Sequence, residues 1–225
     1  QARQMLDETQ WLLDLASQHR FIKGVVGWVD LCSPDLAVQL ARFGEEPKLC
    51  GVRHVVQDEP DEGFMLRDGF LRGIAALAEF GLTYDILIYP RHLSVACDLV
   101  ARFPEQPFVL DHIAKPAIKE GRLAPWAADI RRLARHPNVW CKVSGLVTEA
   151  DWHGWQAADV YPYLDVVFEA FGAGRIMFGS DWPVCTLAAR YKEVVGLLAG
   201  YASKLSTDEQ ASIWGGTARR FYELD

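Results

Sequence analysis

Asp181 ends a short apolar segment and is followed at once by residues that stop a strand. Residues 175–178 (RIMF) favour a buried β-strand, whereas Gly179 and Ser180 interrupt the pattern and Pro183 cannot continue a hydrogen-bonded ladder. A carboxylate at the carboxyl end of a buried strand is placed to take a proton from a water molecule. The same carboxylate can instead cap the following helix, so the other strand ends have to decide between the two roles.

Polar residues also sit at the ends of three other apolar segments: Arg53 with His54, Asp111 with His112, and Lys142 with Ser144. Side chains alternate along a strand, so neighbouring residues are expected to face opposite ways. We favour His112 facing the site, with Phe108 and Leu110 beneath it and Asp111 turned toward the helices. The reverse arrangement places Asp111 in the site and makes His112 a core histidine. For Arg53 and His54 the same choice stays open.

Strand-like and helix-like segments alternate along the whole chain. Apolar runs predict strands, and apolar residues at helical spacing predict helices. The predicted strands lie at 22–30, 49–54, 84–89, 108–113, 139–144 and 175–181. The predicted helices lie at 5–19, 33–43, 65–80, 92–103, 124–135, 161–171, 187–198 and 207–221.

Six βα units of this kind predict an α/β fold with a parallel sheet, either doubly wound or closed into a barrel. No G-x-G-x-x-G and no Walker pattern follows a strand, which removes the main support for a nucleotide-binding doubly wound sheet. Polar groups at the ends of four different strands favour the mouth of a (β/α)8 TIM-like barrel. We therefore expect residues 1–225 to form a single barrel domain whose first two strands lie outside this sequence.

The composition excludes several classes of partner. Half of the residues are hydrophobic, which suits one globular core, and the net charge of −7 argues against nucleic acid. No apolar run reaches the length of a membrane span. The five cysteines are odd in number and widely spaced, as expected for free thiols in a reducing cytoplasm. The sequence therefore predicts a cytoplasmic protein that acts on a small molecule.

Common catalytic motifs are absent. No H-x-H, H-E-x-x-H or C-x-x-C spacing points to a metal site, and no G-x-S-x-G elbow points to a serine hydrolase. Hydrolysis by a water molecule held in the protein, with Asp181 as the base, is the chemistry that remains.

Three segments carry a resemblance to a known family: 110–116 (LDHIAKP), 141–146 (CKVSGL) and 178–184 (FGSDWPV). In this order they resemble the lactonase branch of the amidohydrolase superfamily, which holds sugar-lactone hydrolases and pyrone-dicarboxylate lactonase. The segments 25–31, 51–54 and 84–88 match as well, so the resemblance runs nearly end to end.

The resemblance implies a (β/α)8 barrel and a role for three residues. Asp181 matches the aspartate that shuttles the proton of the attacking water, His112 the histidine at the substrate carbonyl, and Arg53 a substrate-binding position. The first-strand H-x-H pair of the family has no match here, and the strand at 84–89 ends in Tyr89 where metal-binding relatives place a histidine. Whether the protein binds a divalent metal such as zinc stays open.

These observations predict a hydrolase of carbohydrate metabolism that opens a sugar-acid lactone. Asp181 and His112 are the expected catalytic residues, and Arg53, His54 and Trp182 the expected substrate-binding ones. Two alternatives remain: a zinc-dependent decarboxylase of the same superfamily, and a degenerate barrel that binds without catalysing.

We expect a neutral sugar lactone as the substrate and not a dicarboxylate. Two carboxylates require at least two cationic groups, of which Arg53 supplies one. The acidic loop 57–62 (QDEPDE) is expected to repel a second carboxylate, unless it is solvated and distant from the site. Tryptophans at 152, 155 and 182 suit the apolar face of a sugar ring, although each can equally be a packing residue.

Overall fold

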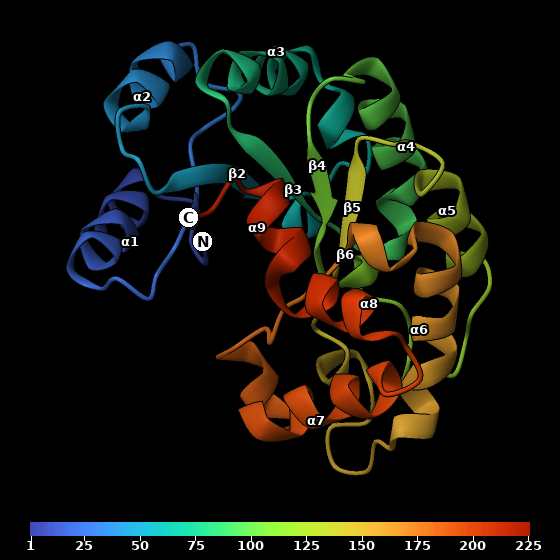
Figure 1. The fold of residues 1–225 in the computed structure, drawn as a ribbon. Helices are drawn as coiled ribbons and strands as arrows, with labels where there is room; N and C mark the ends of the chain where they lie inside the picture. Colours follow the sequence, from blue (N-terminus) through green and yellow to red (C-terminus); the bar gives the residue numbers. More distant parts are fainter.

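The computed structural model describes all 225 residues of the chain. Strands and helices alternate as predicted, and Figure 1 labels β2 to β6 and α1 to α9. The strands are β1 Val25–Gly27, β2 Leu49–Val55, β3 Thr83–Leu87, β4 Phe108–Leu110, β5 Val139–Val143 and β6 Ile176–Phe178. The helices are α1 Leu6–Gln18, α2 Leu36–Phe43, α3 Asp68–Leu77, α4 Leu93–Arg102, α5 Trp126–Leu133, α6 Ala157–Phe171, α7 Tyr191–Ala202, α8 Thr207–Ala211 and α9 Thr217–Phe221.

All six strands are parallel and lie in sequence order, β1-β2-β3-β4-β5-β6. This order arises when each strand is followed by a helix that returns the chain to the same end of the sheet. The sheet is curled, and β1 and β6 are its two edges. The predicted α/β, barrel-type fold is confirmed, and every strand delivers its carboxyl end to the same mouth.

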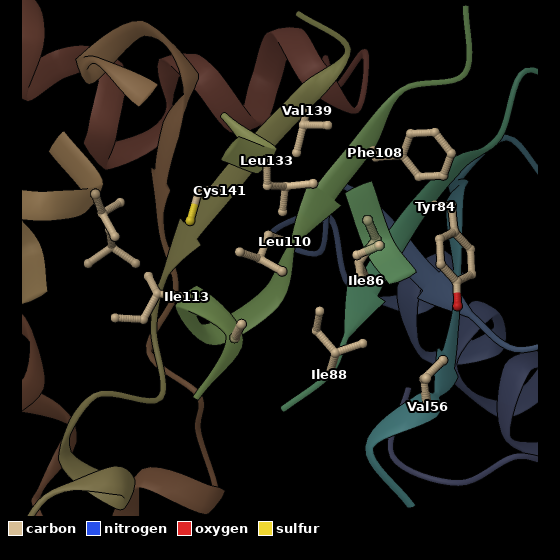
Figure 2. Close-up of a cluster of buried hydrophobic side chains, with 14 of the residues drawn as sticks. Val56, Tyr84, Ile86, Ile88, Phe108, Leu110, Ile113, Leu133, Val139 and Cys141 are labelled. Carbon is tan, nitrogen blue, oxygen red and sulfur yellow. The ribbon is translucent and has the colours of Figure 1, made fainter. Parts of the chain in front are cut away.

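The core lies between the sheet and the helices. One row of helix-facing strand residues consists of Val52, Tyr84, Phe108 and Val139, which are paired across β2 to β5 and are wholly buried. Figure 2 shows Tyr84, Phe108 and Val139 together with the next row toward the carboxyl ends of the strands, which contains Ile86, Leu110 and Cys141. Burial of each large side chain in these rows contributes about 1.5–3 kcal/mol to folding.

The opposite face of the sheet is partly polar. Its smaller apolar cluster consists of Val109, Met177 and Phe221, and Phe221 brings α9 against this face. Arg53 and Asp85 occupy paired positions in β2 and β3, and Lys142 pairs with Met177 in β5 and β6. Charged groups therefore line the inside of the curled sheet, on the side away from the main core.

Several predicted boundaries are wrong. The strand predicted at 22–30 is only Val25–Gly27, the strand predicted at 175–181 ends at Phe178, and the helix predicted at 161–171 begins at Ala157. Three further predictions also differ. The strand predicted at 108–113 ends at Leu110, and the helix predicted at 187–198 lies at Tyr191–Ala202, after a short 3-10 turn at Val184–Leu187. The helix predicted at 207–221 is two helices separated by a π-helical turn, Ser212–Gly216, that contains two adjacent glycines. No helix is both long and apolar enough to cross a lipid bilayer.

Candidate functional site

The segment after β4 brings two polar residues into the mouth of the sheet. Leu110 faces the helix layer, so strand alternation turns Asp111 to the inner face. The chain then leaves the strand through a left-handed turn in which His112, Ile113, Ala114 and Lys115 all have φ between 47° and 60°. This turn returns His112 to the same side as Asp111, and both residues line one cavity.

The structure thus places His112 at the cavity, but the orientations expected for its neighbours are wrong. Phe108 and Leu110 pack toward the helices and do not lie beneath His112, and Asp111 does not face the helices. The period-2 rule failed because it applies only to extended backbone, which ends at Leu110. Left-handed backbone costs about 1–2 kcal/mol per non-glycine residue, and such strain is common at functional sites.

His112 and Asp181 meet across the mouth from β4 and β6. Nε2 of His112 lies 3.6 Å from Oδ1 of Asp181, and both side chains are about nine-tenths buried. Nδ1 of His112 lies 2.8 Å from Oγ of Ser144, at the end of β5. The other carboxylate oxygen of Asp181, Oδ2, is buried and has no hydrogen-bond partner in the protein. The site therefore presents one free carboxylate oxygen beside one imidazole nitrogen.

The environment of the site shifts the pKa values of His112 and Asp181 in opposite directions. Burial, reinforced by the cations Lys115, Arg53 and Lys142, lowers the pKa of His112 to about 3. Burial also raises the pKa of Asp181 to about 6, although Lys115 opposes the shift. At neutral pH His112 is thus uncharged, whereas Asp181 is ionised but more basic than an ordinary aspartate.

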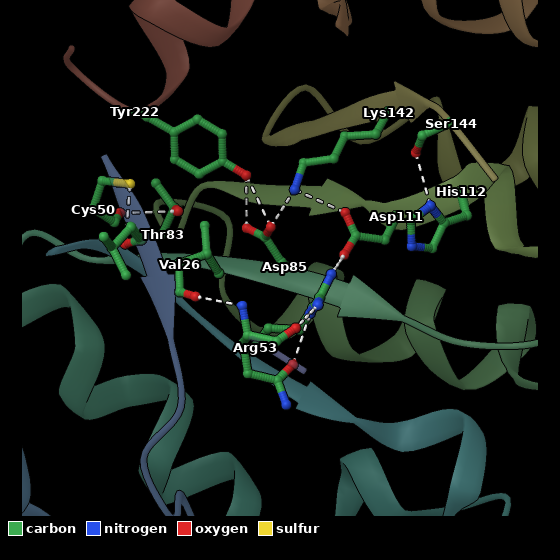
Figure 3. A network of polar contacts seen from close by, with 12 residues as sticks. Val26, Cys50, Arg53, Thr83, Asp85, Asp111, His112, Lys142, Ser144 and Tyr222 are labelled. Atoms are coloured by element: carbon green, nitrogen blue, oxygen red, sulfur yellow. Dashed lines mark hydrogen bonds and ion pairs between the residues drawn. The ribbon is translucent and has the colours of Figure 1, made fainter. Parts of the chain in front are cut away.

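Beneath this pair lies a buried network of charges, drawn in Figure 3. Asp111 accepts a hydrogen bond from Arg53 Nη1 at 2.8 Å and lies 2.9 Å from Lys142 Nζ. Lys142 also donates to Asp85, whose two oxygens each lie 2.9 Å from the Tyr222 hydroxyl. Burial alone would raise the pKa of Asp111, but Lys142 and Arg53 outweigh it and hold that pKa below its usual range.

The sequence did not predict this network. Asp85 is wholly buried between Tyr84 and Ile86 in the middle of a buried strand, and that charge among buried residues was the available signal. Tyr222 lies 137 residues away along the chain, and no local pattern links it to Asp85.

The expected substrate-binding residues divide between the inside of the sheet and the helix layer. Arg53 lines the cavity, where it also donates to the Gln1 side chain at 2.8 Å and to the Gln1 carbonyl. Trp182 lies at the rim and is 66% exposed. The structure places His54 elsewhere: it shares the helix-facing row of Ile86, stacks on Phe64 and lies 2.7 Å from Glu59, outside the cavity.

The acidic loop 57–62 and two of the three tryptophans, Trp152 and Trp155, do not line the cavity, contrary to expectation. No residue of 57–62 lines the cavity, because Glu59 pairs with His54, Asp61 with Arg67, and Glu62 lies 3.6 Å from Arg91. Trp152 lines a separate surface cavity, and Trp155 packs against the core and donates to the carbonyl of Ala188.

The cavity has a volume of about 680 Å³, which suits a small ligand. No group of three or more His, Cys, Asp or Glu side chains in this chain is arranged to hold a metal ion. His112 and Asp181 supply two donors, and Asp111 is already neutralised by Arg53 and Lys142. The residues of this chain do not by themselves fit a divalent metal.

Comparisons with known proteins find relatives along nearly the whole chain. A family model described as amidohydrolase matches residues 2–224. An L-fucono-1,5-lactonase of Burkholderia multivorans is 46% identical over 235 residues, which cover 100% of this chain and 79% of the relative. An L-fucono-1,5-lactonase of Burkholderia ambifaria is 39% identical over 97% of this chain and 77% of its own length.

A solved structure has the same fold. It is the crystal structure of an amidohydrolase from Burkholderia multivorans with bound zinc, which is 47% identical and superposes with a TM-score of 0.96. The superposition covers 100% of this chain and 82% of that one. With a family model that spans nearly all of its residues and relatives of this similarity, the chain belongs to the amidohydrolase family.

Proposed function

We propose that this protein is a hydrolase that opens a sugar-acid lactone of the L-fucono-1,5-lactone type to the open-chain hydroxy acid. The observation that carries the proposal is the approach of His112 Nε2 to within 3.6 Å of Asp181 Oδ1, beside the free Oδ2 of the same carboxylate. The names of the two relatives that are 46% and 39% identical support the choice of substrate.

In this mechanism Asp181 is the general base. Its Oδ2 accepts a proton from a water molecule, whose oxygen attacks the lactone carbonyl carbon and forms a tetrahedral intermediate. A pKa of about 6 suits this role, because the carboxylate is ionised at neutral pH and yet basic enough to accept the proton. Collapse of the intermediate breaks the bond to the ring oxygen, and the proton held by Asp181 passes to the departing alkoxide.

His112 and Arg53 act on the substrate oxygens. His112 is neutral and faces Asp181, so its ring lies where it can polarise the carbonyl and stabilise the developing oxyanion. The Arg53 guanidinium is anchored by Asp111 at 2.8 Å, which leaves it held at the cavity wall to bind ligand oxygens. Trp182, exposed at the rim, offers a flat apolar surface to the sugar ring.

The charge of the cavity supports a neutral substrate. Its two cations, Arg53 and Lys142, are each paired with Asp111, and Lys142 also contacts Asp85. Asp181 adds a further negative charge, so no free pair of cations is available for two carboxylates.

The experiment is a parallel assay of L-fucono-, L-rhamnono- and galactonolactone and of pyrone dicarboxylate. We expect at least one sugar lactone to be hydrolysed with the highest kcat/KM. Faster turnover of the dicarboxylate than of every sugar lactone, or no turnover of any lactone, would refute the proposal.

A further inference from the structure

The Ser144 hydroxyl makes a single hydrogen bond in the structure, and its partner is the imidazole of His112. Its Oγ lies 2.8 Å from Nδ1 of His112, and both residues are buried. Figure 3 shows the pair at the end of the charge network, with the hydroxyl directed at the ring. A buried serine with one partner has few ways to arrange its hydroxyl proton. The contact therefore bears on which nitrogen of the His112 ring carries a proton.

Two glycines hold the pair in place by allowing close approach. A Cβ at Gly145, where φ is +63°, would lie 2.9 Å from Cβ and Cγ of His112. A Cβ at Gly179 would lie 2.9 Å from Cβ of Ser144. Such distances are below van der Waals contact, so the strand ends that carry ring and hydroxyl approach each other only because both positions are glycine.

The proton on the ring has one arrangement that satisfies every neighbour. A neutral imidazole carries one N–H, and Nε2 faces a carboxylate oxygen of Asp181, which can only accept. With the proton on Nε2, this approach is attractive, and Nδ1 accepts a hydrogen bond from the Ser144 hydroxyl. With the proton on Nδ1, the Nε2 lone pair would face the carboxylate, and the hydroxyl proton would have no acceptor in the protein.

We propose that Ser144 is a positioning residue that keeps the proton of His112 on Nε2, so that the ring meets the lactone carbonyl as a hydrogen-bond donor. The inference rests on the proposed function for its chemical meaning. It assigns His112 the part of the electrophile and leaves proton abstraction to Asp181. Ser144 itself does not touch the substrate; it acts through the ring that it orients.

The tautomer can be read directly, without any substrate. In protein labelled with ¹⁵N-histidine, two-bond ¹H–¹⁵N correlations report which ring nitrogen carries the proton, and a His112→Asn variant identifies the His112 signals. We expect the wild-type protein to show an Nε2–H, Nδ1-acceptor pattern at neutral pH. In Ser144→Ala we expect the Nδ1 signal to lose the shift of a hydrogen-bonded acceptor, with both tautomers populated.

Kinetics supply the second readout. Ser144→Ala is expected to lower kcat about 10-fold or more with KM changed less than about twofold, since a donor aimed at the transition state is disturbed and ground-state contacts are not. Ser144→Thr, which keeps the hydroxyl, is expected to restore both the tautomer and most of kcat. Ser203→Ala, which deletes a hydroxyl on the remote end of α7, is the matched control and is expected to match the wild type.

An Nδ1–H pattern in the wild type would overturn the inference, as would a Ser144→Ala variant with an unchanged tautomer and unchanged kcat. Absence of lactone hydrolysis in the wild type would refute the proposed function alone, because the tautomer measurement stands without turnover.

Discussion

Gly145→Ala tests whether the close approach at the end of β5 is what sets the position of His112. The added Cβ would lie 2.9 Å from two atoms of the His112 side chain and 3.0 Å from Nδ1. The residue also sits at φ +63°, where an alanine is strained. Gly121→Ala is the matched control, because Gly121 has the same φ of +63° and nothing within 4 Å of its added Cβ.

Comparing the two variants distinguishes the backbone strain of a left-handed alanine from the steric clash with His112. Both are expected to lose about 1–2 kcal/mol of unfolding free energy for a left-handed alanine. Gly145→Ala is expected to lose a further ~1–3 kcal/mol, because the ring is buried and cannot move without displacing its neighbours. A ring displaced by about 1 Å is expected to lower kcat about 10²-fold, whereas Gly121→Ala should keep the wild-type kcat.

The assay combines urea unfolding, monitored for an unchanged m-value, with steady-state hydrolysis of the preferred lactone. Equal losses of unfolding free energy in the two variants, or a wild-type kcat in Gly145→Ala, would refute the argument that glycine is needed here for contact with His112.

Three further predictions concern charge and binding. Because Asp181 acts as a base and its pKa is raised to about 6, kcat/KM should fall about tenfold per pH unit below that value and stay level above it; an activity plateau extending to pH 4 would contradict this. Asp111→Asn leaves Arg53 and Lys142 without their shared carboxylate and should cost about 3–5 kcal/mol in urea unfolding, whereas a loss below about 1 kcal/mol would show that the network contributes little. Trp182→Ala should raise KM severalfold with unfolding free energy changed by less than about 0.5 kcal/mol, and an unchanged KM would remove Trp182 from the binding surface.

Periodicity was enough to predict the architecture. The strands β1 to β6 all fall on apolar runs, since strands covered by helices need apolar residues on at least one face. The wrong boundaries lie where the chain changes conformation locally. The left-handed turn at His112–Lys115 follows an apolar, strand-like pattern, and nothing in the residue types there forces φ to change sign.

The residues of the candidate site that lie at strand ends could be predicted from the sequence, whereas the charge network inside the sheet could not. Asp181, His112 and Arg53 were found because each is a polar residue at the end of an apolar segment. His54 carries the same signal, but it belongs to the helix-facing row and pairs with Glu59. The pairing of Asp85 with Tyr222 depends on how the end of the chain packs inside the sheet, which is a tertiary property.

The central claim is that Asp181 activates water to hydrolyse a sugar lactone, and the kcat of Asp181→Asn on L-fucono-1,5-lactone tests it most directly. Asparagine has the same shape but cannot accept the proton, so we predict a loss of about 10²–10⁴-fold in kcat with an unfolding free energy no lower than that of the wild type. A folded Asp181→Asn protein whose kcat stays within about threefold of the wild type would contradict the account.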